Sequence, residues 1–276
     1  MMYKGIFSKT FATTNVDDNF RTIKSLGYAA TQFNFASAGL PSLPTAIADE
    51  KIEEIAAAAR KHGVRIEAIS ATFNMTHPTQ DVINKGMASL SVICEAAARL
   101  GCPLVTLCTG TLDAEDQWRF HPDNNTPQAW QKIRETMAQA LQIASRYDVS
   151  LGIEPELANI VSSAEKARQL IDEMKSDRLK VIFDPANLFE VATITEQHAI
   201  VKKALDLLAD DIAIAHAKDR NTDGSFATAG KGVLDYHFYL KQLSASGFNG
   251  CVVTHGLADS EAQDVSLMLD KHLHIL

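Results

Sequence analysis

Four side chains able to bind a metal ion each stand at the end of a short apolar run in the second half of the chain. They are Glu154 in IEPE, Asp184 in IFDPAN, His216 in IAHAKD and His255 in VVTHG. Successive members are 30, 32 and 39 residues apart, and one strand with its crossover helix takes roughly 30 residues or more. Carboxylates and imidazoles together suit Mn, Zn, Co or Mg. The spacing therefore predicts one divalent-metal site, built from consecutive parallel strands.

A single polar residue at the end of a strand is often only a turn former, so none of the four is diagnostic alone. Four of them after consecutive apolar runs indicate a shared site. Glu154 and His255 are also the candidate catalytic residues, because each can exchange a proton with a substrate. The ordinary pKa of an imidazole, about 6.5, suits proton transfer near neutrality better than that of a glutamate, about 4.3. If His255 only caps its strand, three protein ligands remain.

Eight short apolar runs, each followed by a longer stretch with helical periodicity, divide the chain into alternating units. The predicted strands are 5–11, 29–35, 65–73, 104–110, 150–156, 180–187, 211–219 and 250–256. Four of the predicted helices end in a glycine stop, at Gly27, Gly63, Gly101 and Gly247. Eight strand–helix repeats favour an α/β fold, a (β/α)8 TIM barrel, over the alternative of a doubly wound open sheet. No linker interrupts the pattern, which predicts a single domain over residues 1–276.

Residues just beyond the strand ends of a barrel surround the mouth where active sites lie. The candidate substrate-binding residues chosen on this ground are Glu156, Asn187, Lys218, Asp219, Asn74, His77, Thr109 and Trp118. Trp118 belongs to the longest irregular stretch, 112–127, where an aromatic ring can stack on an apolar face of a ligand. For each of these residues, a contact that merely shapes a loop is an equally good explanation.

Composition and charge argue against several classes of function. The chain has 26 Lys and Arg against 34 Asp and Glu, a net charge of −8, so we expect no nucleic-acid partner. No apolar run approaches the roughly 20 residues that span a bilayer, so we expect no membrane insertion. The four cysteines lack CxxC spacing and lie in apolar surroundings, which indicates reduced thiols and a cytoplasmic location. The number of subunits is left open, a homo-oligomer included.

The segments GIEPE, VIFDPANLF and AHAKD, with the later GKGVLDYHFYLKQLSASGFNGCVV, resemble the xylose isomerase-like TIM barrel superfamily of sugar phosphate isomerases and epimerases. The resemblance extends over essentially the whole chain. It implies one divalent metal ion held by Glu, Asp, His and a second Glu on strands five to eight, the two glutamates taking and returning a proton. Glu154, Asp184 and His216 match this pattern. Strand eight departs from it, because it offers Thr254 and His255 where the second Glu is expected.

The resemblance implies a small-molecule substrate, a sugar, ketose or sugar phosphate. It would be isomerised or epimerised by proton abstraction next to a carbonyl, through a metal-stabilised enediolate. A dehydratase acting on a keto-polyol would begin with the same abstraction and stays an alternative. Hydrolysis of a phosphodiester, as in the distantly similar endonuclease IV, is disfavoured because the chain is acidic and lacks a basic stripe. The missing glutamate leaves a further alternative, a non-catalytic sugar-binding barrel with a degenerate metal site.

Overall fold

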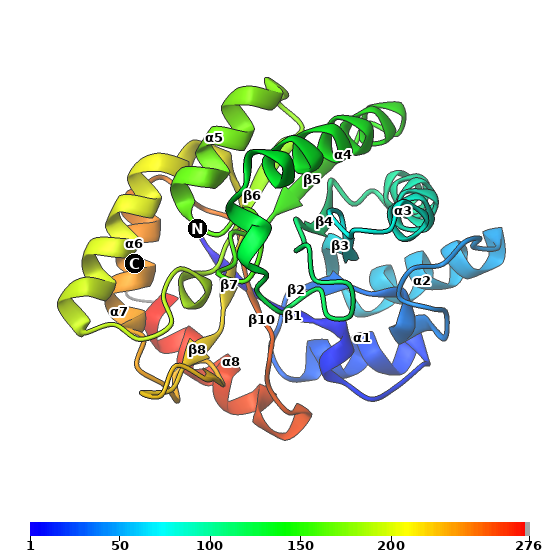
Figure 1. The fold of residues 1–276 in the computed structure, drawn as a ribbon. Helices are drawn as coiled ribbons and strands as arrows, with labels where there is room; N and C mark the ends of the chain where they lie inside the picture. Colours follow the sequence, from blue (N-terminus) through cyan, green and yellow to red (C-terminus); the bar gives the residue numbers. More distant parts are fainter. Residues whose placement is uncertain (274–276) are drawn as a thin grey trace.

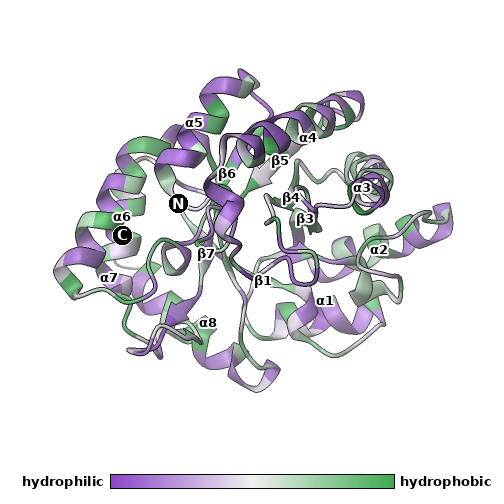
Figure 2. Ribbon diagram, in the orientation of Figure 1, coloured by the Kyte–Doolittle hydropathy of each residue, from purple (hydrophilic) through white to green (hydrophobic). Residues whose placement is uncertain are grey.

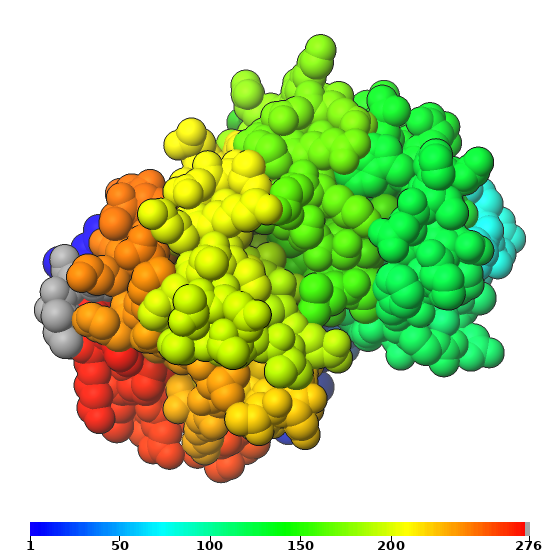
Figure 3. Space-filling model, turned by 60° about the vertical axis from the view of Figure 1, so that its left-hand side comes forward, coloured from blue at the N-terminus to red at the C-terminus, as the bar shows by residue number. Residues whose placement is uncertain are grey.

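Eight parallel strands form a closed barrel in the structure, a computed structural model that describes residues 1–273 (Figure 1). The strands of the barrel are β1 (Tyr3–Phe7), β2 (Ala30–Phe33), β3 (Arg65–Asn74), β4 (Leu104–Cys108), β5 (Ser150–Ile153), β6 (Leu179–Phe183), β7 (Ile212–Ala217) and β10 (Cys251–Thr254). The ring closes where β10 pairs with β1, and Figure 3 shows blue N-terminal residues beside the orange segment near the end of the chain. The closed ring confirms the predicted TIM barrel and excludes the open sheet.

Eight α-helices in the described part of the chain surround the barrel. They are α1 (Val16–Ser25), α2 (Asp49–His62), α3 (Gln80–Leu100), α4 (Pro127–Arg146), α5 (Ala164–Met174), α6 (Ile194–Leu208), α7 (Tyr236–Ala245) and α8 (Ala262–Leu273). Figure 2 shows hydrophilic and hydrophobic residues alternating along them, as expected for helices with one face on the strands. Within residues 1–273, none of these helices has the length and hydropathy needed to cross a bilayer.

Shorter elements shape the loops around the barrel. Residues 1–273 contain six 3-10 helices, η1 (Ser8–Thr10), η2 (Phe35–Ala38), η3 (Pro122–Asn125), η4 (Pro185–Asn187), η5 (Ala209–Asp211) and η6 (Asp259–Glu261). A small antiparallel hairpin, β8 (Asp219–Arg220) with β9 (Phe226–Ala227), follows β7. Several of these elements follow the C-terminal ends of barrel strands and so form the rim of the barrel mouth. They are η1, η2, η3, η4 and the β8–β9 hairpin.

Local sequence signals define where the helices begin and end. The side chain of Thr193 accepts a hydrogen bond from the backbone N–H of Glu196, whose carboxylate accepts one from the N–H of Thr193, a capping box that starts α6. Helices α2 and α3 end at Gly63 and Gly101, with φ of 61° and 67°, a left-handed conformation that glycine adopts without steric cost. All four predicted glycine stops have positive φ.

All eight strands occur where predicted, but the bounds of each differ from the predicted range, and every strand except β3 ends earlier than predicted. The first and the seventh show why. The first strand covers Tyr3–Phe7 instead of 5–11, because the chain turns at Ser8, whose hydroxyl accepts a hydrogen bond from the backbone N–H of Asn34 at 2.9 Å. The seventh ends at Ala217, and the residues after it enter the β8–β9 hairpin, which was not predicted. The last three residues of the predicted domain, 274–276, lie outside the described residues.

The interior of the barrel is filled by a layer of small and branched side chains. Its members are Ala30, Ala68, Leu104, Ile182, Ile214, Cys251 and Val253. Gly5 leaves room for this layer, since a Cβ there would lie 2.6 Å from the sulfur of Cys251 and 3.2 Å from the carbonyl oxygen of Ala30. All four cysteines of the chain are buried and free of disulfides. The layer supports the polar residues at the C-terminal ends of the strands.

Gly5→Ala is expected to destabilise the barrel by about 1–3 kcal/mol, because the new methyl group overpacks against Cys251. Cys251→Ala is expected to lose stability by leaving a cavity. In the double variant each change relieves the other, so the total loss should be smaller than the sum of the single losses. Urea unfolding of the three variants measures this coupling, and strictly additive losses would contradict the contact.

Candidate metal centre

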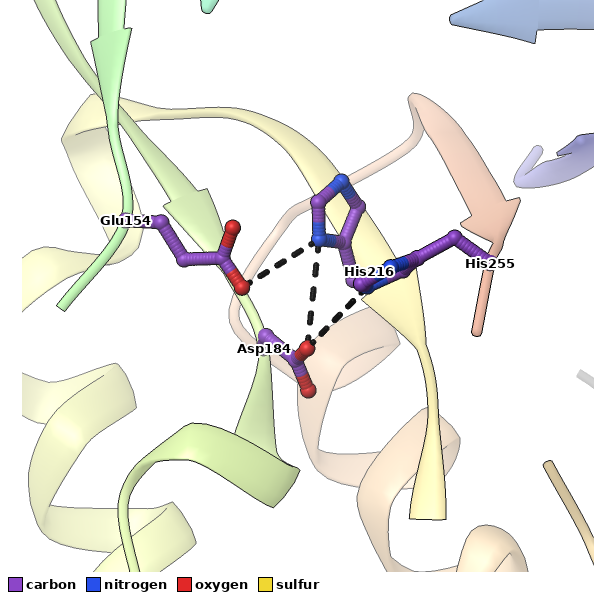
Figure 4. Close-up of side chains that lie close together, drawn as sticks. All are labelled: Glu154, Asp184, His216 and His255. Carbon is purple, nitrogen blue, oxygen red and sulfur yellow. Dashed lines mark hydrogen bonds and ion pairs between the residues drawn. The ribbon is translucent and has the colours of Figure 1, made fainter. Parts of the chain in front are cut away.

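The four predicted metal ligands come together at the C-terminal ends of four neighbouring strands (Figure 4). Glu154, Asp184 and His255 are the first residues beyond β5, β6 and β10, and His216 lies near the end of β7. One ligand atom from each residue lies within 4.8 Å of those of all the others. Parallel strands bring their carboxyl ends to one face of a barrel, so residues at equivalent strand positions converge there.

The distances within the cluster suit a shared ion better than direct hydrogen bonds. Nδ1 of His216 lies 3.4 Å from Oε1 of Glu154 and 3.9 Å from Oδ2 of Asp184, and Nε2 of His255 lies 3.4 Å from the same Oδ2. These separations are long for hydrogen bonds between nitrogen and oxygen. Ligands bound at 2.0–2.2 Å to one ion lie roughly 3–4 Å from one another. The donor set and its spacing therefore fit a divalent metal.

Gln32 orients the imidazole of His216 from across the barrel. Its amide oxygen lies 2.9 Å from Nε2 of His216, and its amide nitrogen donates to the hydroxyl of Thr106 at 3.3 Å. Because an amide oxygen only accepts, Nε2 carries the proton and Nδ1 presents a lone pair. That lone pair faces the carboxylates of Glu154 and Asp184. A cation placed between the imidazole and the two carboxylates would stabilise this arrangement. Metal-binding histidines commonly have such a partner on the other ring nitrogen.

The carboxyl group of Asp184 is fully shielded from water. Burial alone would raise its pKa, but the charge of Lys218 and the contact with His255 outweigh burial, so the pKa of Asp184 lies well below its ordinary value. Nζ of Lys218 is 3.5 Å from Oδ2, and the backbone N–H of Ala186 donates to Oδ1 at 2.9 Å. Burial and the neighbouring His216 lower the pKa of His255. Asp184 is thus ionised and His255 neutral near pH 7, as metal ligands must be.

Three predicted substrate-binding residues lie beside the metal cluster. The side-chain amide of Asn187 donates to Oε1 of Glu154 at 2.6 Å, and its oxygen accepts a hydrogen bond from Lys218 at 2.9 Å. Burial, followed by the negative charge of Glu154, raises the pKa of Glu156 to about 7. Glu156 can therefore hold or release a proton near neutrality. Their assignment as substrate ligands stays a prediction.

The other predicted substrate-binding residues lie elsewhere on the rim. The carboxylate of Asp219 accepts hydrogen bonds from four backbone N–H groups of residues 220–234, and so organises the loop after β7. Thr109 and Asn74 are buried, and both side chains bond to neighbouring loops. His77 and Trp118 line a separate cavity beside α3, as does Asn74. Asn74, His77 and Trp118 therefore share one cavity, which none of the four metal ligands lines, whereas Asp219 and Thr109 hold loops in place.

Sequence reasoning missed Gln32. The contact with His216 joins residues 184 positions apart, so neither local pattern nor repeat spacing indicates it. The available signal is a buried amide in the middle of β2, whose four residues ATQF are all buried. A polar side chain at a buried position needs a partner, and that requirement could have marked Gln32 for attention.

The sequence profile of the xylose isomerase-like TIM barrel family matches residues 20–269, so the chain belongs to this family. The match confirms the resemblance found in the sequence. A search of curated proteins found no match.

Solved structures share the fold over nearly the whole chain. The 3-keto-D-glucoside 4-epimerase from E. coli has a TM-score of 0.75 at 20% identity, covering 98% of this chain and 99% of that one. The IOLI protein with a bound zinc atom has a TM-score of 0.71 at 16% identity, covering 98% and 99%. D-psicose 3-epimerase from Clostridium cellulolyticum H10, solved with D-tagatose, has a TM-score of 0.72 at 16% identity, covering 100% and 99%. At these identities the likeness shows the shared fold.

Asp184→Asn is expected to remove most of the bound metal, because it takes away the buried charge at the centre of the cluster while keeping the side-chain shape. The protein is loaded with Co²⁺, desalted and measured by elemental analysis. Asp177→Asn, which changes an exposed carboxylate before β6, serves as the control and should keep the metal. Wild-type metal content in the Asp184 variant would refute this assignment of the site.

Gln32→Leu is expected to weaken Zn²⁺ binding about 10- to 100-fold, since His216 loses the acceptor that holds its tautomer. Gln32→Glu should keep at least wild-type affinity, because a carboxylate accepts the same hydrogen bond. Competition with a chromophoric chelator gives the dissociation constants. Equal affinities for the Leu variant and the wild type would mean that Gln32 does not orient the ligand.

Proposed function

We propose that the protein is a divalent-metal-dependent isomerase or epimerase of a keto-sugar. The observation that carries the proposal is the group of four ligand atoms within 4.8 Å of one another at the mouth of the barrel. The similar structures named above support it, because two are called sugar epimerases and a third holds zinc. An acidic chain with this donor set is better suited to a neutral sugar than to a polyanion.

Glu154, Asp184, His216 and His255 would hold the ion. When bound, the ion supplies Lewis-acid polarisation of a substrate carbonyl. The side chains around the cluster would hold the ligands in position and keep water out. Lys218 and Asn187 are both buried and linked to the cluster by hydrogen bonds or charge, so they keep the carboxylates in place and exclude bulk water.

Glu154 would take the proton from the carbon next to the carbonyl. Its Oε1 is held by Asn187 and faces His216, whereas Oε2 has no hydrogen-bond donor among residues 1–273. As Oε2 accepts the proton, the electron pair of the broken C–H bond moves toward the carbonyl, and the substrate becomes an enediolate. A carboxylate with one oxygen anchored and one free is both oriented and reactive.

The proton must return from a second group if the configuration is to invert. His255 is the leading candidate, because its side chain is partly exposed at the mouth, on β10, across the cluster from Glu154 on β5. Its lowered pKa keeps the imidazole neutral at rest. To return a proton, His255 would first take one up from solvent on a ring nitrogen that does not hold the ion, and would then pass it to the substrate carbon. Glu156, with a pKa of about 7, is the other group able to do so.

Exchange of substrate hydrogen with solvent tests the proposal. Metal-loaded protein in D2O should incorporate deuterium next to the carbonyl of D-fructose, D-tagatose or D-psicose, followed by NMR. Glu154→Gln should slow the exchange by roughly 10²- to 10⁴-fold, the usual contribution of a general base. Metal content is measured in parallel, and Glu50→Gln, an exposed carboxylate on α2, is the control.

The products of the same experiment separate the alternatives. A sugar that binds the metal-loaded protein without any exchange would contradict an enzymatic role and indicate a binding protein. Loss of water from the substrate would identify a dehydratase. His255→Gln should lower turnover by about 10²-fold, and unchanged turnover in that variant would assign the return of the proton to Glu156, to be checked with Glu156→Gln.

A further inference from the structure

A cavity of about 760 Å³, the second candidate site of this barrel, lies on the β3 side. It is open to solvent and is lined by the end of β3, by α3, by the loop after β2 and by the segment 113–118 after β4. Figure 1 shows α3 beside β3 and β4, on the side of the barrel opposite α6 and α7. None of the four metal ligands lines it. The cavity is large enough for a sugar-sized ring in addition to whatever the metal centre holds.

A row of uncharged polar side chains connects this cavity with the metal centre. Thr72, which lines the cavity, lies 3.0 Å from the hydroxyl of Ser70. Ser70 is paired in the sheet with Thr106, which accepts a hydrogen bond from Gln32, the partner of His216. These residues occupy the adjacent strands β2, β3 and β4 and then cross to β7. A substrate lying along this row would reach both sites.

The wall of the cavity is largely apolar. Leu43 comes from the loop after β2, Val82 from α3 and Phe73 from β3, and Trp118 lines it from the segment after β4. The side chain of Trp118 is about half exposed, at 49%. An exposed indole at the edge of an apolar hollow offers a face on which a flat or ring-shaped group can stack.

The charges around the cavity disfavour an anion. Asp113, Glu115 and Asp116 line it, against the cations Lys85 and, if protonated, His77. The nearby Arg119 is already engaged, because its guanidinium pairs with Asp113 and Glu115 at 2.6 and 2.9 Å. With Arg119 and Lys85 counted against the three carboxylates, the net charge around the cavity stays at about −1, which does not attract a phosphate. A neutral group is the better match.

We infer that this cavity is a subsite for a neutral ring attached to the sugar, so that the substrate is a glycoside and not a sugar phosphate. The inference rests on the proposed function and specifies its substrate class. The reacting sugar would lie at the metal centre and its attached ring against Trp118. The polar row of β2 to β4 would pass beneath the bond that joins the two rings.

Binding of two glucosides tests the inference without requiring turnover. The chain has two tryptophans, Trp118 and Trp130, so Trp130→Phe leaves Trp118 as the one indole fluorophore. In this background 4-nitrophenyl β-D-glucoside should quench the fluorescence, whereas methyl β-D-glucoside should not. By calorimetry, Trp118→Ala should weaken binding of the nitrophenyl glucoside by about threefold to tenfold and leave methyl glucoside unaffected. Phe120→Ala, an exposed aromatic outside the cavity, is the matched control.

Filling the cavity provides an independent variant. Val82→Trp, at an exposed position of α3, should also weaken binding of the nitrophenyl glucoside and spare methyl glucoside. Equal effects on both glucosides, no binding of the nitrophenyl glucoside by the wild type, or preferential binding of D-glucose 6-phosphate would each overturn the inference. If deuterium exchange fails while the nitrophenyl glucoside still depends on Trp118, the proposed reaction is wrong and the subsite stands. The opposite pattern rejects the subsite alone.

Discussion

The burial of the Asp184 carboxylate, where four strands end, is the constraint on which the rest of the site depends. A carboxylate shielded from water is stable only when positive charge and hydrogen-bond donors surround it. Lys218 and the N–H of Ala186 provide part of this, but Glu154 and Glu156 add negative charge beside it. Two imidazoles complete the cluster. A divalent cation balances this set in both charge and ligand type.

Much of the fold could be predicted because its signals are local. Each barrel strand is a short, mainly apolar run. The glycine stops and capping residues that end or begin the helices act on backbone groups only a few residues away. The predicted strand bounds were wrong where contacts between distant residues determine the end of a strand. The first strand ends at Phe7 because Ser8 turns to bond with Asn34, and the hairpin after β7 depends on pairing between Asp219–Arg220 and Phe226–Ala227. Such contacts leave no periodic trace in the sequence.

The metal cluster could be predicted for the same reason as the fold, since neighbouring strands of a barrel are also neighbours in the chain. The partners of those ligands could not. Gln32 reaches His216 across the barrel, from β2 to β7, and the second cavity is assembled from three separate segments around α3. The mouth of the barrel therefore has two chemically different halves. Strands β5, β6, β7 and β10 carry the charged groups, whereas β2, β3 and β4 carry hydroxyl and amide groups that lead away to an apolar hollow.

The most direct measurement of the central claim is a crystal structure of the Co²⁺-loaded protein, with the ion located by its anomalous scattering. We expect one strong peak between β5, β6, β7 and β10, about 2.0–2.2 Å from Nδ1 of His216 and from oxygens of Glu154 and Asp184, with Nε2 of His216 still bonded to Gln32. A peak elsewhere, or an ion that leaves His216 and Asp184 uncoordinated, would contradict it.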